Sequence, residues 1–458
     1  MKQSAESGSR ASFSGRIGYV LAVAGSAIGL GNIWRFPYLV AKYGGGIFLL
    51  IYLVLTLTFG YTMIVSETAL GRMTKRGPSG AFQAFDHSPL GKLGGWINAV
   101  IPMLIVPYYS VIGGWVLKYL VACFADGIDT LAQDDYFSAF LADSPQVVLY
   151  FVLFSVLVFA VILAGVRRGI EQISKVVMPV MLVLAVIVAV YSCTRPGALA
   201  GIAYFLVPNF RNFSLMTFAA AMGQMFYSLS IAMGILYTYG SYLKSDVDIE
   251  KSTGELEFFD TGVAVLAGLM IIPSVFSFFG GDIGKLHAGP SLTFITLPAV
   301  FASMPGGTFA AATFFLLFLL AALTSAISLL ETSVNTFEDG LHISRGKASL
   351  MMAVIMAAVG LSSSLGFGVW SSVKLLGMDI LDFFDFLTNS VMMPIAALAT
   401  CLLILRKVGF AAIEAEVGQS SPFRRRPLYR FCLKYLAPVC LVIILASSIA
   451  SALGLITM

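Results

Sequence analysis

Charged residues are scarce in this 458-residue chain, and hydrophobic residues are abundant. Asp, Glu, Lys and Arg together make up 11% of it, whereas soluble domains contain about 25%. Hydrophobic residues make up 58%. This balance excludes an ordinary soluble domain and indicates an integral membrane protein. The formal net charge of +4 gives no indication of a nucleic-acid partner, and we expect none.

Cysteines, histidines and nucleotide-binding motifs offer little chemistry. The five cysteines have no CxxC spacing, so neither a disulfide framework nor a zinc site is indicated. Three histidines leave little for metal binding or acid–base catalysis. Gly29 and Gly31 do not begin a dinucleotide fingerprint, because the third glycine is missing, and no phosphate-binding GxxxxGKS or GxxxxGKT motif occurs. No nucleophile–base constellation is visible, and we expect the protein not to be an enzyme.

Long apolar runs dominate the sequence. About 20 apolar residues suffice for a helix to span a bilayer, and by this rule we expect eleven spans. They lie near residues 17–41, 46–71, 95–122, 147–164, 172–193, 214–242, 259–280, 308–337, 348–366, 380–405 and 432–455. The apolar segment 289–305 is short and bracketed by prolines, so we expect an outer loop that folds back into the protein rather than a twelfth span.

The basic residues between the spans predict the orientation. Arg167, Arg168 and Lys175 lie between spans four and five, and six basic residues lie between spans ten and eleven. The loop 126–143, between spans three and four, is acidic and contains no Lys or Arg. Because basic loops stay in the cytoplasm, we expect a multi-pass protein of the cell's inner (plasma) membrane. Its N-terminus is expected in the cytoplasm and its C-terminus outside the cell.

Span one contains residues that a plain membrane helix avoids. The stretch 25–37 (GSAIGLGNIWRFP) carries three glycines, an asparagine, an arginine and a proline inside an apolar run. Unsatisfied backbone groups are costly in hydrocarbon, so a membrane helix breaks only where it lines a cavity or is packed in protein. The free carbonyls and N–H groups of such a break suit a cation and a carboxylate. We therefore expect a binding site at this break.

Span six has a similar interruption. Residues 223–234 (GQMFYSLSIAMG) place Gln224, Ser228, Ser230 and two glycines inside an apolar run. Small residues also allow close helix packing in membranes, and for span six alone this alternative is equally good. Two interrupted spans, five apart, favour a transporter built of two inverted repeats with its site between them.

Three ionisable residues lie in or near the apolar spans. Arg35 and Glu67 have apolar surroundings, and Asp385 lies near the start of span ten. Ionisable residues at such positions indicate a function and need a partner, unless they lie at a helix end and reach the interface. This alternative is weak for Arg35 and stronger for Glu67, because Arg72 follows it closely.

Thr324 and Ser325 lie in the middle of span eight. Their hydroxyls could simply bond back to the carbonyl four residues earlier, which is common in membrane helices. Alternatively, they could coordinate a hard cation such as sodium, with further oxygens from the break in span one.

These residues match a known family. The stretch 25–37, with the following Gly44-Gly45-Gly46, resembles the first-helix signature of the neurotransmitter:sodium symporters. Residues 223–234, Thr324-Ser325 and 294–298 (FITLP) resemble that family too, and the match covers essentially the whole chain.

The resemblance implies an all-α integral membrane protein with a LeuT-type fold. Residues 1–458 would form a single transmembrane transporter domain. Two inverted five-helix repeats would comprise residues 17–193 and 214–405, and residues 432–455 would add an eleventh helix. Many relatives have twelve helices, so the C-terminal end departs from that pattern.

The resemblance also implies two bound sodium ions. The first site would use the carbonyl of Ala27, the side chain of Asn32, the hydroxyl and carbonyl of Ser228, the substrate carboxylate and Asp260. The second would use the carbonyls of Gly25, Ile28 and Ala321 and the hydroxyls of Thr324 and Ser325. Asp260 stands where the family usually has Asn, and would supply the negative charge that chloride supplies in other relatives. We therefore expect chloride independence.

The substrate site implied by the resemblance surrounds the same break. The carboxylate would meet the N–H groups of Leu30 and Gly31 and the hydroxyl of Tyr109 or of its neighbour Tyr108. The ammonium would meet carbonyls near Ala27, Tyr227 and Ser230, with Ser228 alongside. Gly29 leaves room for an α-carboxylate where monoamine transporters of this family carry Asp. The side-chain pocket would be formed by Ile105, Ile112, Tyr227, Met233, Ser328 and Leu329.

Two gates follow from the resemblance. Arg35 would pair with Asp385 on the outer side, with Tyr227 as a lid. Arg10 would pair with Asp339 on the cytoplasmic side. Gly169 and Pro179 have the family's spacing in span five, which lets its inner end unwind and admit water to the second sodium site.

We therefore expect a sodium-coupled importer of neutral, hydrophobic L-amino acids, both aliphatic and aromatic, that works by alternating access in a lipid bilayer. Two alternatives stay open: a proton-coupled amino acid permease, and a non-transporting amino acid receptor or channel of the same fold. The sequence leaves the preferred amino acid and the oligomeric state open.

Overall fold

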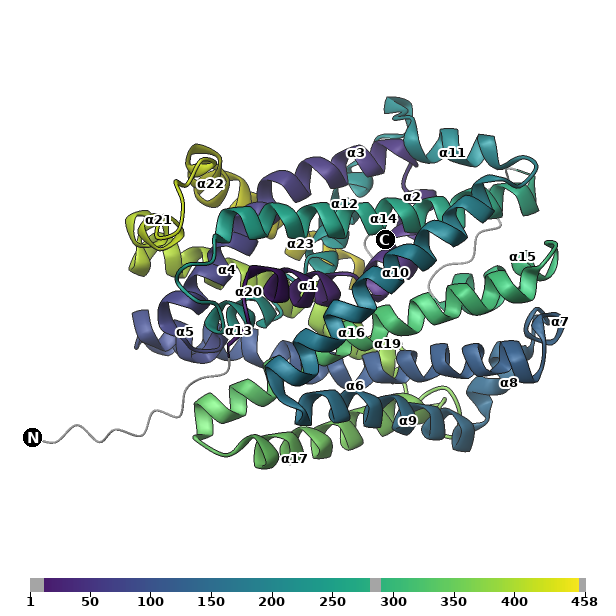
Figure 1. The fold of residues 1–458 in the computed structure, drawn as a ribbon, viewed down its shortest axis with the longest axis horizontal. Coiled ribbons are helices and arrows are strands. Elements are labelled where there is room, and N and C mark those ends of the chain that lie inside the picture. Colours follow the sequence, from purple (N-terminus) through teal and green to yellow (C-terminus); the bar gives the residue numbers. More distant parts are fainter. Residues whose placement is uncertain (1–11, 281–289, 453–458) are drawn as a thin grey trace, which may run out of the picture.

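The computed structural model describes residues 12–280 and 290–452, and within them it contains helices and no β-strand (Figure 1). Nine helices in this part of the chain are long and apolar enough to cross a membrane. A tenth span consists of α1 (Arg16–Ala27) followed by η1 (Gly31–Arg35) and α2 (Phe36–Lys42), whose two parts are bent by 48°.

Another broken span accounts for the remaining difference from the eleven expected. Helices α12 (Leu215–Ser228) and α13 (Ile235–Ser241) lie on either side of a six-residue interruption at 229–234. Together they occupy the segment expected for span six. Interruptions in spans one and six were both expected from the sequence.

The other spans are continuous apart from local changes of helical pitch. Spans two to five are α3 (Gly46–Leu55), η2 (Thr56–Gly60) and α4 (Tyr61–Thr74); α6 (Pro89–Ala125); α9 (Ser144–Leu163); and η3 (Val166–Glu171) with α10 (Gln172–Cys193). Spans seven to nine are α14 (Ile249–Phe279); α16 (Gly307–Leu341); and α17 (Arg345–Ile355), η7 (Met356–Gly360) and α18 (Leu361–Leu365). Spans ten and eleven are α19 (Ile380–Asp385), η8 (Phe386–Met392), α20 (Met393–Leu403) and η9 (Ile404–Val408); and α22 (Arg426–Phe431), η10 (Cys432–Leu436) and α23 (Ala437–Ala452).

Short helices lie in the connections. They are α5 (Pro78–Phe85), α7 (Ile128–Leu131), α8 (Tyr136–Ala142), α11 (Ala198–Leu206), η4 (Phe210–Asn212), η6 (Leu292–Thr296), α15 (Leu297–Ala302) and α21 (Phe410–Val417). Residues 292–302 form an apolar helix that is too short to be counted as a span, as expected. Pro290, just before it, lines a cavity of about 360 Å³.

Several helices extend beyond the apolar runs that revealed them. α14 begins at Ile249, ten residues before the predicted start of span seven. Its first turns carry Glu250, Lys251 and Glu255, so the hydropathy of this part is low. The side chain of Asp248 accepts the main-chain N–H of Lys251 and caps the helix. Hydropathy detects the part of a helix in lipid, whereas the cap determines where the helix starts.

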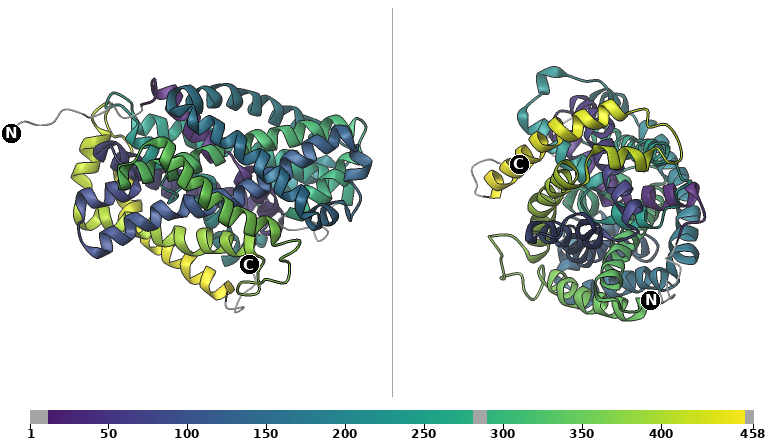
Figure 2. Two further views of the ribbon diagram at one scale, coloured as in Figure 1. Left: turned by 90° about the horizontal axis from the view of Figure 1, so that it is seen from below. Right: turned by 90° about the vertical axis from the view of Figure 1, so that its left-hand side faces the viewer.

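The helices differ in how much of their surface faces other helices. In the most apolar part of α6, 83% of the residues are buried inside the protein, against 28% in α9. α6 is therefore a central helix, and α9 presents most of its side chains to the surroundings. α23 runs along the outside of the bundle, as the end-on view shows (Figure 2). α1 packs against α10, α14 and α16, and nine of its 12 residues are buried.

Candidate functional site

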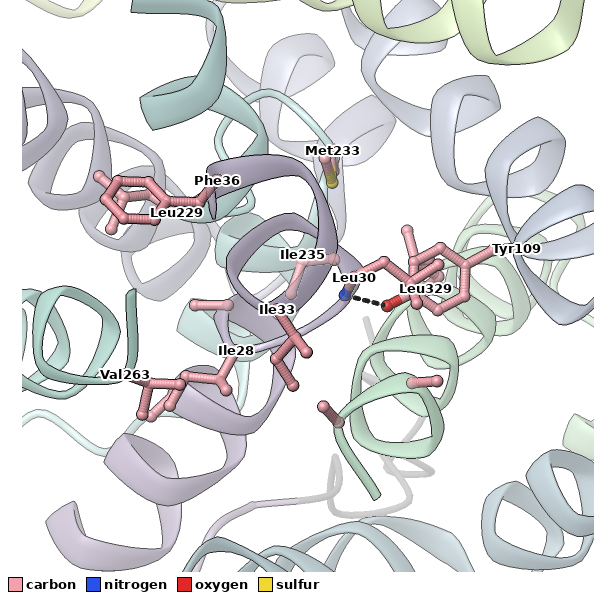
Figure 3. Close-up of a cluster of buried hydrophobic side chains, with 14 of the residues drawn as sticks. Ile28, Leu30, Ile33, Phe36, Tyr109, Leu229, Met233, Ile235, Val263 and Leu329 are labelled. Carbon is pink, nitrogen blue, oxygen red and sulfur yellow. Dashed lines mark hydrogen bonds between the residues drawn. The ribbon is translucent and has the colours of Figure 1, made fainter. Parts of the chain in front are cut away.

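The helix of span one is interrupted among buried residues. α1 ends at Ala27, and the helix resumes with η1 at Gly31. The main-chain N–H of Leu30 lies in this interruption and donates to the hydroxyl of Tyr109 at 3.1 Å (Figure 3). The interruption exposes carbonyls at the end of α1 and N–H groups at the start of η1, which suit a cation and an anion respectively.

Span six is interrupted with a strained backbone. α12 ends at Ser228 and α13 begins at Ile235. Between them Ser230, Ala232 and Gly234 have positive φ angles of 53°, 60° and 72°. Left-handed backbone costs a non-glycine residue about 1–2 kcal/mol, so neighbouring groups must hold this segment in place.

Glu67 of α4 is one such group. Its side chain is fully buried, and Oε1 accepts the N–H of Ala232 at 2.9 Å. Among the described residues, Oε2 has no hydrogen-bond partner. The alternative in which Glu67 reaches the membrane interface is therefore wrong. The nearby Arg72 instead donates to Glu416 at 2.6 Å.

Side chains join the two interruptions directly. The amide nitrogen of Gln224 donates to the carbonyl of Gly31 at 2.8 Å. The hydroxyls of Ser26 and Ser230 lie 3.2 Å apart. The breaks of spans one and six are thus parts of one structure.

A small cavity of about 20 Å³ lies between the two breaks. Several of its side chains converge from different helices in Figure 3. Its wall combines apolar side chains with hydroxyl groups, and none of the residues that line it is charged. They are Ser26, Ala27, Gly29, Leu30, Gly31, Ile105, Tyr109, Tyr227, Ser230, Met233, Ile235, Ser325 and Leu329.

The cavity contains all the predicted substrate-site residues except Tyr108, Ile112, Ser228 and Ser328. The adjacent tyrosines differ in their contacts. Tyr109 faces the break, whereas the Tyr108 hydroxyl turns toward span ten and lies 3.2 Å from a carboxylate oxygen of Asp385. Ile112 lies nearly one helical turn beyond Tyr109 and lines a second, larger cavity, described below.

The two serines are engaged elsewhere. The hydroxyl of Ser328 donates to the carbonyl of Thr324 at 3.1 Å and accepts from Tyr239 at 2.8 Å. Ser328 therefore does not line the cavity in this conformation, and its role in the substrate pocket stays a prediction. Ser228 contacts Asp260 rather than the cavity.

Two cavity residues, Ser26 and Ile235, were not predicted. Ile235 is the first residue after the second break, so the boundary of the break could have revealed it. Ser26 is a polar residue one turn before Leu30 in an apolar run, and this signal was overlooked.

The residues predicted for the first sodium site form a buried cluster. Asp260 accepts hydrogen bonds from the amide of Asn32 at 2.8 Å and from the hydroxyl of Tyr52 at 2.7 Å. The hydroxyl of Ser228 lies 2.8 Å from the same carboxylate. All four side chains are fully buried. A buried carboxylate surrounded by neutral oxygens suits a hard cation. Ala27, whose carbonyl was also predicted for this site, is the last residue of α1.

Tyr52 was not predicted. It lies in a uniformly apolar span, and nothing in the sequence distinguishes it from the other aromatic residues there.

The residues predicted for the second sodium site meet where α16 packs against the end of α1. The hydroxyl of Ser325 donates to the carbonyl of Ser26 at 2.8 Å and lies 3.5 Å from that of Gly25. The hydroxyl of Thr324 lies 3.1 Å from the carbonyl of Ala321. An added Cβ at Gly25 would lie 3.3 Å from Thr324, so the two helices are in close contact here.

The two interpretations of Thr324 are compatible. Its hydroxyl proton is directed to a carbonyl of its own helix, at 3.1 Å from both Leu320 and Ala321. The oxygen keeps its lone pairs, which a cation could use. Ile28, also predicted for this site, is the buried residue that follows α1, and its N–H donates to Ala24.

A larger cavity of about 360 Å³ lies outside the central one, and Leu30 and Tyr227 line both cavities. Arg35 and Asp385 lie on its wall, but in the part of the chain that the structure describes no ion pair within 4.0 Å joins them. The Arg35 guanidinium lies 5.4 Å from the centroid of the Tyr227 ring, and Asp385 accepts from Asn389 at 2.6 Å. The predicted outer pair is thus separated in this conformation.

The opposite end of the bundle is closed by a network around Glu331. This fully buried carboxylate accepts from the hydroxyl of Tyr242 at 2.7 Å and from Arg345 at 2.5 Å. Arg345 also donates to the carbonyl of Ile162 at 2.8 Å. The network connects spans four, six, eight and nine.

The predicted inner gate is described only in part. Arg10 lies outside the described residues, while Asp339 accepts the N–H of Gly77 at 2.8 Å. In span five, Gly169 lies in η3 and Pro179 lies inside α10, so this segment is helical here. One end of the bundle thus contains the larger cavity, whereas the end around Glu331 is packed.

Comparisons with known proteins agree with this architecture. The model of the sodium:neurotransmitter symporter family matches residues 10–137 and 136–455. An uncharacterized sodium-dependent transporter of Bacillus subtilis (strain 168), YhdH, is 35% identical over 94% of this chain and 95% of its own length. An uncharacterized sodium-dependent transporter of Haemophilus influenzae is 31% identical over 96% of this chain and 98% of its own.

A solved structure extends the likeness to three dimensions. The crystal structure of MhsT in complex with L-phenylalanine superposes with a TM-score of 0.87, at 33% identity, and covers 96% of this chain and 100% of that one. The fold and the two facing interruptions thus define an all-α, multi-pass membrane transporter of the LeuT type. The chain belongs to the sodium:neurotransmitter symporter family, whose members are transporters and not enzymes.

Proposed function

We propose that this protein is a chloride-independent symporter that imports neutral hydrophobic L-amino acids together with sodium. One observation carries the proposal: the groups suited to the substrate carboxylate and those suited to a cation lie side by side at the same break. Leu30 and Gly31 offer N–H groups beside the Tyr109 hydroxyl. The next residue, Asn32, contacts Asp260.

The chemistry of the cavity supports an amino acid with an uncharged, apolar side chain. Ile105, Met233, Ile235 and Leu329 supply apolar contacts, and the flexible thioether of Met233 can adapt to different shapes. A charged side chain would lose its hydration without gaining a partner. The relative MhsT was crystallised with L-phenylalanine, which has the expected chemistry.

The cavity is too small in this conformation to hold an amino acid. Tyr227 and Leu30 separate it from the outer cavity, so movement of the Tyr227 ring would open and enlarge it. We infer that substrate enters from the outer cavity. Closure of Tyr227, and approach of Arg35 to Asp385, then isolates it.

Two sodium ions are proposed, at the two oxygen clusters. The first would share the substrate carboxylate with Asn32, Ala27, Ser228 and Asp260. The second would bind between α1 and α16, using Gly25, Ile28, Ala321, Thr324 and Ser325. Sodium at either place stabilises the broken helix, so sodium and substrate each strengthen the binding of the other by the same factor.

The broken helices would move against the rest of the bundle during transport. We assign residues 17–193 and 214–405 to two inverted repeats, with residues 432–455 added at the end. The moving unit would contain spans one, two, six and seven. From the basic loops we propose that the N-terminus lies in the cytoplasm and the C-terminus outside the cell.

Binding of radiolabelled L-phenylalanine to the purified protein tests the site. Binding in sodium, absent in potassium, is expected. Leucine and tryptophan should displace the label, whereas glutamate and lysine should not.

The adjacent tyrosines offer a matched pair of variants. Tyr109→Phe removes a hydroxyl that faces the carboxylate position. A hydrogen bond to a charged group contributes about 1.5–3 kcal/mol, so binding should weaken roughly 10- to 150-fold. Tyr108→Phe should leave it nearly unchanged, because that hydroxyl contacts span ten. Equal binding in sodium and potassium, or equal loss in the two variants, would contradict the proposal.

A further inference from the structure

A groove opens between the first helix of span one and the first half of α14, which pack against each other (Figure 1). Its volume is about 530 Å³. Two large apolar side chains line it and are largely exposed, Ile17 at 64% and Phe258 at 75%. Ile17 lies at the start of expected span one and Phe258 lies next to the start of expected span seven, so we infer that both side chains face the edge of the lipid rather than bulk water.

Cationic side chains stand at one end of the groove. Arg16 lies 3.4 Å from Glu255, and both side chains are about one-third exposed. Lys251 lines the groove as well, and no ion pair of its ammonium occurs among the described residues. The rim therefore carries one positive charge in excess beside an apolar channel.

A second groove lacks the combination of basic and apolar side chains that lines the first one. It lies between α9 and the helix of span nine, with Phe151 and Met356 on its wall, and has a volume of about 470 Å³. None of the residues that line it is charged. Lipid chains can lie against both grooves, but only the first can recognise a headgroup.

We propose that the groove between α1 and α14 binds an anionic phospholipid from the leaflet that contains the beginning of α14. The phosphate would lie against Lys251 and Arg16. One acyl chain would lie along Ile17 and Phe258. The basic rim of the groove thus matches the negative headgroup, and its apolar wall matches the acyl chain.

Lipid at this position contacts both helices that build the first sodium site. α1 ends at Ala27, and Phe259, which also lines the groove, directly precedes Asp260. Movement of α1 away from α14 would take the groove apart. The bound lipid therefore stabilises the conformation in which α1 lies against α14, with the inner end closed.

Two glycines of α14 allow a matched test. A Cβ added at Gly254, in the groove, meets no heavy atom within 4 Å, and the same holds for Gly262, which does not line the groove. A substitution by leucine therefore starts from open space at either position and favours the helix equally. Gly254→Leu fills the place of the acyl chain, whereas Gly262→Leu leaves it free.

The experiment measures saturable binding of fluorescent phosphatidylglycerol and phosphatidylcholine to the purified full-length protein in detergent. Wild type should prefer phosphatidylglycerol. Lys251→Gln should weaken its binding about fivefold, the contribution of one cation near a membrane surface. Gly254→Leu should abolish saturable binding, and Gly262→Leu should retain it. Glycerol phosphate, which has the headgroup charge and no chain, should not compete.

Equal binding of the two lipids, or retained binding in Gly254→Leu, would overturn the proposal. Competition by glycerol phosphate would show a site for a soluble anion instead. A monodisperse size-exclusion profile verifies that each variant is folded, and Lys251→Gln provides the test if Gly254→Leu is not. The assay needs no transport, so failure of lipid binding is distinguishable from failure of the proposed symport.

Discussion

Replacing Asp260 by Asn separates the charge of the proposed first sodium site from its shape. The carboxylate is fully buried and has hydrogen-bond donors from Asn32, Tyr52 and Ser228, at 2.7–2.8 Å. Two unit charges about 4 Å apart interact by about 4 kcal/mol at an effective dielectric constant of 20, and by about 1 kcal/mol in water. Removal of the charge should therefore weaken sodium binding roughly 5- to 1,000-fold.

Stability should respond in the opposite direction. Without sodium, Asp260 is a buried anion, and a buried charge costs more than a buried amide. The Asp260→Asn variant should thus have an unchanged or higher melting temperature in potassium. The stabilisation that wild type gains on adding sodium should be small or absent in the variant.

The assay combines two measurements on the same purified protein. One is the sodium concentration that gives half-maximal binding of radiolabelled L-phenylalanine. The other is the melting temperature in sodium and in potassium. Asp260→Glu, which keeps the charge and moves it by one methylene, is the control, and it should lose less sodium affinity than the amide.

Chloride provides a further readout for Asp260. If this carboxylate supplies the negative charge of the site, wild-type uptake should be equal in chloride and gluconate, whereas uptake by Asp260→Asn should be stimulated by chloride. Normal sodium affinity in Asp260→Asn would show that Asp260 does not bind sodium. Strong destabilisation of the variant in potassium would instead show that the residue is structural.

Three further predictions concern other positions. Thr324→Ala should lose about 1–3 kcal/mol of sodium binding, so the sodium concentration for half-maximal L-phenylalanine binding should rise roughly 5- to 150-fold. Thr324→Ser keeps the hydroxyl and should retain the wild-type sodium affinity. Glu67→Leu leaves the Ala232 N–H without its partner, which costs about 1–3 kcal/mol, so its melting temperature should fall more than that of Glu67→Gln, which keeps an acceptor. Glu414 of α21 lies outside the spans; burial alone would raise its pKa, but hydrogen bonds from Arg430 outweigh this and hold the pKa below its ordinary value of 4.5. Its stabilising contribution is complete above the ordinary pKa and is lost as pH falls through the lowered one. The melting temperatures of wild type and Glu414→Gln should therefore differ at neutral pH and converge below about pH 4.

The sequence predicted the broken helices because their signal is local. Glycines and polar residues within an apolar run are costly in a membrane unless they line a site. Both interruptions, at 28–30 and at 229–234, lie where that reasoning placed them. Hydropathy was less informative about helix ends, since the start of α14 depends on the cap at Asp248 rather than on apolar residues.

Contacts between distant segments were harder to predict. The hydroxyls of Tyr108 and Tyr109 point to different partners, and only the packing of α6 against its neighbours shows which one meets Leu30. Tyr52 is 208 residues from Asp260 in the sequence. Glu67 likewise holds the backbone of a segment 165 residues away. Such pairings arise from tertiary packing and leave no pattern in the local sequence.

Uptake of radiolabelled leucine or phenylalanine into proteoliposomes tests whether this protein transports hydrophobic amino acids together with sodium. Inward gradients of sodium, potassium or protons are imposed one at a time, with and without chloride. We expect concentrative uptake with the sodium gradient alone, unaffected by chloride and lost when an ionophore collapses the gradient. Uptake driven by protons without sodium would contradict sodium coupling, and sodium-dependent binding without any uptake would contradict transport.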